Sequence, residues 1–163
     1  MTTFSPDPAL DLVLERVIDV PVARVWAAWT QPELIVQWFT PAPWKTVDCS
    51  IDLYPGGAFR TTMESPEGER FPNAGCILEV VDQRRLTWTS VLGAGFRPVV
   101  PANGADDLPF TAVIAMEPAG AGTRYVATAI HPDAERADRH REMGFFDGWG
   151  AALDQLVALV RGT

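Results

Sequence analysis

The spacing of apolar residues changes along the chain, and each change marks an expected change of secondary structure. Residues 10–20 alternate between apolar and polar positions, with three leucines and Ile18 on one face, as in a half-buried strand. In residues 22–39 the apolar positions recur every three or four residues, which predicts helix. Proline is tolerated in the first turn of a helix but not in its interior, so Pro32 predicts two short helices rather than one. Thr30 is the expected capping residue of the second helix.

From residue 44 to residue 130, the sequence pattern predicts strands joined by turns. Residues 44–64 alternate as one long strand with a kink at Pro55-Gly56-Gly57, because proline cannot donate to a sheet ladder and two glycines permit a sharp bend. Further strands are expected at residues 74–81, 86–92, 110–117 and 123–130. Residues 93–109 lack periodicity, and loops of this length often serve as lids or binding loops.

A single long helix is expected from Asp133 to about Val160. Its apolar stripe consists of Phe146, Trp149, Leu153, Leu156 and Val160, at spacings of three and four residues. The order of elements predicts an α+β fold. In this fold a curved antiparallel sheet carries two short helices and a long C-terminal helix on its concave face.

Composition and charge narrow the class of protein. A chain of 163 residues fits one domain, expected at residues 10–163 after a flexible N-terminal arm of residues 1–9. The formal net charge is −8 without a Lys/Arg cluster, which disfavours a nucleic-acid partner. The sequence shows neither a signal-peptide pattern nor an apolar run long enough to insert into a membrane. Cys49 and Cys76 fit buried thiols in a reducing compartment, so a cytoplasmic location is expected.

A long helix laid across a bent sheet leaves an apolar space, and the alternation of the strands indicates which side chains line it. Tyr125 is the leading polar candidate, because a buried hydroxyl needs a partner that a ligand could supply. The expected lining residues are Trp38, Phe59, Met63, Trp88, Met116, Tyr125, Phe145, Phe146 and Trp149.

Three other polar residues are candidates for chemistry. Arg16 interrupts the apolar face of the first strand; it is expected to pair with a carboxylate or reach solvent, and the alternative is a ligand contact. His131 is expected to begin the last helix, with a general acid or base at the cavity mouth as the alternative. His140 lies among charged residues, which indicates a solvated face. Two histidines nine residues apart do not form a metal pair, so no metal, cofactor or catalytic residue is expected.

Five motifs taken together resemble a known family. They are VWAAWTQPELIVQWF at 25–39, DLYPGG at 52–57, RLTWT at 85–89, GTR at 122–124 and GW at 148–149. This set resembles the START-like (SRPBCC) superfamily, and within it the branch named after the activator of heat shock protein 90 ATPase homologues. The resemblance implies a helix-grip fold with a deep ligand cavity between the sheet and the C-terminal helix. Members of the superfamily bind lipids, sterols, flavonoid-like molecules, polyketides or plant hormones, and a few are cyclases or other enzymes.

Three functions are compatible with these observations. The expected function is the binding of a small hydrophobic molecule, whether aromatic, lipid-like or polyketide-like, in the internal cavity. The first alternative is a polyketide cyclase-like or hydrolase-like enzyme, with Tyr125, His131 or Arg16 as its acid–base group. The second alternative is a chaperone ATPase-regulating domain, which would expose a large apolar patch. The identity of the ligand and the formation of a homodimer are left open.

Overall fold

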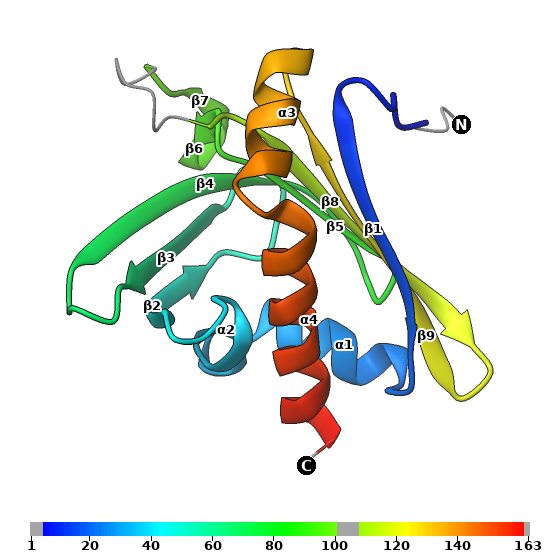
Figure 1. Cartoon of the computed structure of the whole chain (residues 1–163). Coiled ribbons are helices and arrows are strands. Elements are labelled where there is room, and N and C mark those ends of the chain that lie inside the picture. The colour runs from blue at the N-terminus through cyan, green and yellow to red at the C-terminus, as the bar shows by residue number, and fades with distance from the viewer. Residues whose placement is uncertain (1–4, 101–107, 162–163) are drawn as a thin grey trace.

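The structure is a computed structural model that describes residues 5–100 and 108–161 (Figure 1). Its elements in chain order are β1 (Asp11–Ile18), α1 (Val22–Thr30), α2 (Pro32–Trp38), β2 (Lys45–Ile51), β3 (Ala58–Glu64), β4 (Arg70–Val81), β5 (Arg85–Thr89), β6 (Leu92–Gly93), the 3-10 turn η1 (Ala94–Phe96), β7 (Arg97–Pro98), β8 (Thr111–Ala119), β9 (Gly122–Ile130), α3 (Ala134–Glu142) and α4 (Phe145–Arg161).

Seven strands form one antiparallel sheet in the order β1-β9-β8-β5-β4-β3-β2. The first strand pairs with the last, so that Asp11 lies opposite Ile130 and Ile18 lies opposite Thr123. Helix α4 crosses the face of this curved sheet, and α1 and α2 lie at one end of it (Figure 1). The α+β fold predicted from the order of elements is confirmed.

The stretch that contains Pro32 forms two helices, as predicted, but the capping role given to Thr30 is wrong. Thr30 is the last residue of α1, and its hydroxyl donates back to the Trp26 carbonyl at 2.7 Å. Gln31, in extended backbone, is the N-cap of α2, without a side-chain capping bond. Proline at the first position of α2 starts this helix with its φ already set, so a capping side chain is not required.

The long kinked strand predicted over residues 44–64 is wrong, because the chain reverses there. β2 and β3 pair with each other antiparallel, with Ile51 opposite Phe59. The connection packs tightly: a Cβ atom at Gly57 would lie 2.0 Å from the Asp52 carbonyl oxygen. Pro55-Gly56-Gly57 therefore marks the tip of a hairpin rather than a bend within one strand.

The C-terminal segment holds two helices where one was predicted. Asp133 caps α3 by accepting a hydrogen bond from the Arg136 backbone N–H at 2.9 Å. α3 ends at Glu142, and Gly144 adopts a φ of 94° before α4 begins at Phe145. Glycine adopts this left-handed conformation at little energetic cost. A glycine in this conformation is a common helix end. A short loop therefore separates α3 from α4 (Figure 1).

Part of the predicted loop at residues 93–109 has regular structure. β6 and β7 form a small two-stranded sheet around the η1 turn, with Leu92 opposite Pro98. Residues 101–107 lie outside the described residues, so the interpretation of the whole loop as a lid stays a prediction.

At the N-terminus, residues 1–4 also lie outside the described residues. The next residues make local hydrogen bonds, in which the backbone N–H of Asp7 donates to the Asp11 carboxylate at 2.7 Å. The flexibility of the arm and the domain limits at residues 10–163 stay predictions.

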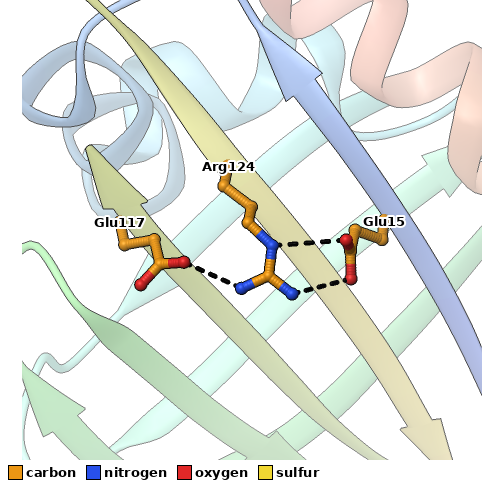
Figure 2. A network of polar contacts seen from close by, with 3 residues as sticks. All are labelled: Glu15, Glu117 and Arg124. Carbon is orange, nitrogen blue, oxygen red and sulfur yellow. Dashed lines mark hydrogen bonds and ion pairs between the residues drawn. The ribbon is translucent and has the colours of Figure 1, made fainter. Parts of the chain in front are cut away.

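The outer face of the sheet carries an ion network that joins three strands (Figure 2). Arg124 on β9 donates two hydrogen bonds to Glu15 on β1, at 3.2 and 3.0 Å, and one to Glu117 on β8, at 2.8 Å. All three side chains are about half exposed, so solvent screens their attraction and the stabilisation is modest. The neighbouring residue Tyr125 is buried on the opposite face. The network therefore belongs to the outside of the sheet, away from the cavity.

Among the described residues, no helix is both long enough and apolar enough to cross a membrane.

Candidate functional site: an aromatic cavity under α4

A cavity of about 420 Å³ lies between the concave face of the sheet and α4. One wall is a stripe of α4 with the spacing of a helical face, namely Phe145, Gly148, Trp149 and Ala152. The volume falls in the range of pockets that hold small molecules. Asn73, Ala74 and Met143 line it and are exposed, so they mark where the cavity opens to solvent.

Aromatic rings from helices and strands make most of the opposite wall. The ring centroids of Trp29 and Trp38 lie 4.8 Å apart in an edge-to-face arrangement. Trp88 lies 5.2 Å from Trp29 and 5.3 Å from Phe59, so the cluster continues from α1 and α2 onto β5 and β3. Such contacts add to the stabilisation from burial and hold the rings in fixed orientations. The wall is therefore apolar and rigid.

The structure places seven of the nine predicted lining residues on the cavity wall. They are Trp38, Phe59, Met63, Trp88, Tyr125, Phe145 and Trp149. That they bind a ligand stays a prediction.

The predictions for Met116 and Phe146 are wrong, because neither residue lines the cavity. Met116 is buried near the end of β8, where its backbone N–H bonds to the Arg84 carbonyl, whereas the cavity reaches Phe110 just before the start of that strand. Phe146 is 41% exposed, because it points about 100° around α4 from the cavity-facing Phe145.

Tyr125 places a buried hydroxyl group in the cavity wall, and this hydroxyl has a hydrogen-bond partner within the protein. The indole Nε1 of Trp29 donates to the Tyr125 oxygen at 3.1 Å. Burial raises the pKa of Tyr125 above its ordinary value, and the bond from Trp29 only partly offsets this effect. The hydroxyl therefore keeps its proton at neutral pH and can donate it to a ligand.

The two histidines form a buried pair, which corrects both of their predicted positions. The 2.9 Å contact between His131 Nε2 and His140 Nδ1 joins the two rings, and His131 Nδ1 lies 2.8 Å from the Leu10 carbonyl oxygen. His131 does not cap α3, a role that Asp133 performs, and it does not line the cavity. His140 is 7% exposed rather than solvated, and its ring does line the cavity. Burial, with a smaller contribution from His131, lowers the pKa of His140 from about 6.5 to about 4.

Arg16 lies outside the cavity and takes the first of its two predicted roles. Its Nη1 atom bonds to the Asp154 carboxylate at 2.8 Å and approaches the Gly150 carbonyl oxygen at 3.4 Å. The guanidinium therefore ties β1 to the outer side of α4. The alternative of a ligand contact in the aromatic cavity is not supported by this position.

The two cysteines are free thiols. Burial, with a smaller contribution from Asp48, raises the pKa of Cys49 to about 11, so it carries little thiolate at neutral pH. Within the described part of the chain, no group of three or more His, Cys, Asp or Glu side chains is arranged to hold a metal ion.

Several wall residues were not predicted from the sequence: Trp29, Phe39, Phe110 and His140. The pattern assigns Trp29 and Phe39 to the two short helices and Phe110 to a strand, but spacing does not separate a ring that fills the core from one that borders a void. His140 has charged neighbours at 138, 139, 141 and 142, which hid the fact that its own position faces inward. Its spacing from Phe145 gave no signal either, because five residues lie 140° apart on a continuous helix.

Together, the curved sheet, the crossing helix and the apolar cavity between them define a helix-grip protein of the α+β class. The family model described as activator of Hsp90 ATPase homolog 1-like protein matches residues 19–161. The chain therefore belongs to this family.

Solved structures agree with this assignment. Protein NE0264 from Nitrosomonas europaea is 48% identical, with a TM-score of 0.91 over 96% of this chain and 97% of that chain. A protein from Rhodobacter sphaeroides has a TM-score of 0.81 at 19% identity, over 97% of both chains. An AHSA1-like protein from Aeromonas hydrophila has a TM-score of 0.68 at 21% identity, over 94% of this chain and 93% of that chain. The last two show the shared fold alone. Among curated proteins, none matches.

Proposed function

We propose that this protein binds a small, mainly apolar molecule in the cavity between its sheet and α4. The observation that carries the proposal is the character of the wall. It encloses about 420 Å³, and four of the six tryptophans of the chain line it. Apolar surface that leaves water for such a site contributes binding free energy in proportion to its area.

The lining also indicates the charge of the ligand. It contains no Lys, Arg, Asp or Glu side chain from the described residues. A charged group placed there would lose its hydration without gaining an ion pair, which is costly. The preferred ligand is therefore neutral.

Gly148 offers a direct way to test the cavity. It lies on the cavity stripe of α4, and a Cβ atom built on it meets no atom within 4 Å. A Gly148→Leu substitution therefore adds a side chain on the cavity stripe at a position where the Cβ atom meets no clash. The matched control is Ala158→Leu, which adds a leucine side chain at an exposed position of the same helix.

Binding of 2-methoxynaphthalene, a neutral aromatic probe, can be followed by NMR of the indole N–H groups. In the wild type and in Ala158→Leu we expect saturable shifts at Trp29, Trp38, Trp88 and Trp149, with smaller effects at Trp26 and Trp44. In Gly148→Leu the affinity should fall at least tenfold. A wild type that shows no saturable shift, or a Gly148→Leu variant that binds as well as the control, would contradict the proposal.

An enzyme using the same cavity is the second candidate, favoured by the positions of His140 and Tyr125. A neutral imidazole can take a proton, and a protonated tyrosine can donate one. Hydrolysis of a p-nitrophenyl ester by the wild type, lost in His140→Phe but retained in Ala158→Leu, would support this candidate. The absence of turnover by wild type with such neutral aromatic esters would argue for binding alone.

A further inference from the structure

The hydrogen bonds of the two histidines fix the position of each ring proton. The Leu10 carbonyl can only accept, so the His131 Nδ1 atom, 2.8 Å away, must carry a hydrogen. In a neutral His131 ring the other nitrogen, Nε2, then holds a lone pair. His140 Nδ1 lies 2.9 Å from this lone pair and must donate to it. In a neutral His140 ring, the remaining nitrogen, Nε2, is consequently left as an acceptor.

This acceptor faces the aromatic cavity without a partner. His140 is one of the lining residues, and among the described residues nothing bonds to its Nε2 atom. The ring is held between Phe110 and Phe145, whose centroids lie 5.1 and 5.2 Å from its own. Burial keeps the ring neutral at physiological pH, because the pKa of His140 is lowered to about 4. Among the described residues, Asp11 Oδ1 is the one fully buried side-chain polar atom without a partner, so the unbonded His140 Nε2 is accessible, and a hydroxyl on a ligand in the cavity can donate to it.

We propose that His140 Nε2 is the polar recognition point of the cavity, and that it accepts a hydrogen bond from a hydroxyl group on a neutral aromatic ligand. The inference rests on the proposed function, because it requires that the cavity holds an apolar molecule. His131 acts through His140: it fixes the tautomer and does not touch the ligand. The class of ligand is a phenol or a similar aromatic alcohol, whose ring packs on the tryptophans while its O–H points to His140.

The test compares two probes that differ in one hydrogen-bond donor. 2-Naphthol can donate to His140, whereas 2-methoxynaphthalene has the same ring system and an oxygen but no O–H. For the wild type we expect 2-naphthol to bind about tenfold more tightly, the usual effect of one buried hydrogen bond. In His140→Phe, which keeps a ring of similar size, the ratio of the two affinities should fall to about one.

The outcomes separate the two proposals. Equal affinity of both probes for the wild type overturns the role of His140 and leaves the ligand cavity standing. A wild type that binds neither probe overturns the ligand cavity itself. A preference for 2-naphthol that survives in His140→Phe also overturns the role of His140.

A second measurement on the wild type does not depend on the folding of the variant. Nitrogen-15 NMR of the histidine side chains reports which ring nitrogen carries a hydrogen. We expect His140 to show a protonated Nδ1 and an unprotonated Nε2, and the Nε2 signal to move when 2-naphthol is added. A hydrogen on Nε2 in the free protein, or an Nε2 signal unmoved by saturating 2-naphthol, overturns the inference.

Discussion

Tyr125 and Trp29 form a buried polar contact within an otherwise apolar wall. The Trp29 indole donates to the Tyr125 oxygen at 3.1 Å, and both side chains are at most 3% exposed. A buried N–H without an acceptor is costly, so each residue fixes the position of the other. Alternation along β9 predicted that Tyr125 faces inward. Its partner lies 96 residues away in sequence, and no local pattern identifies it.

Removal of the hydroxyl should destabilise the protein although the aromatic ring remains. We expect Tyr125→Phe to lower the free energy of unfolding by about 1 to 3 kcal/mol, because the Trp29 N–H loses its acceptor in a buried site. Urea denaturation followed by tryptophan fluorescence measures the change. The matched control is Tyr54→Phe at the other tyrosine, which is 59% exposed and should change stability by less than about 0.5 kcal/mol. Equal effects at both positions would contradict the assigned contact.

The break between α3 and α4 is the feature of the helices that shapes the site. It places His140, at the end of α3, and Phe145, at the start of α4, in ring contact with a centroid distance of 5.2 Å. Both residues line the cavity. A continuous helix through Gly144 would rotate them to different faces, since five residues correspond to 500° of turn, or 140° apart.

Two Gly→Ala substitutions four residues apart should have opposite effects on stability. Gly144 has a φ of 94°, a conformation that costs other residues about 1 to 2 kcal/mol, so Gly144→Ala should be destabilising. Gly148 lies inside α4 with open space at its Cβ position, so Gly148→Ala should stabilise by about 1 kcal/mol through helix propensity. Thermal or urea unfolding of both variants measures the difference. A stabilising Gly144→Ala would show that α3 and α4 join as one helix.

At the scale of the whole molecule, the histidine pair ties together the beginning and the end of the fold. Leu10 precedes β1, His131 follows β9, and His140 lies in α3, so one chain of hydrogen bonds joins three segments. The pairing of β1 with β9 brings the first two segments together. A change in the protonation of this pair should therefore affect global unfolding.

The stability of the fold should decrease in mild acid. The pKa of His140 is about 6.5 in an unfolded chain but about 4 in the fold, so the unfolded chain binds its proton first as the pH falls. The contribution of neutral His140 to the free energy of unfolding is complete above about pH 6.5 and declines as the pH falls towards 4. Carboxylates titrate over an overlapping range, so the quantity to measure is the difference in unfolding free energy between wild type and His140→Phe. From pH 7 to pH 4 we expect the unfolding free energy of the wild type to fall relative to that of His140→Phe. A difference that stays constant over this range would contradict the buried pair.

The sequence by itself determined the class of the fold, because that class follows from local patterns. Period-two alternation gave the strands, Pro32 separated the short helices, and the apolar stripe from Trp149 to Val160 gave the final helix. These signals depend on neighbours a few residues apart. The same alternation identified Phe59, Trp88 and Tyr125 as inward-facing residues, which the structure places on the cavity wall.

Only the tertiary structure decided which inward-facing residues border empty space and which polar groups meet there. Met116 and Phe59 both face inward, but only Phe59 reaches the cavity, because the helices fill the concave face unevenly. His140 looked solvated from its neighbours, yet the turn at Gly144 and the pairing of β1 with β9 bury it against His131. Such contacts depend on segments distant in sequence, and local spacing carries no information about their packing.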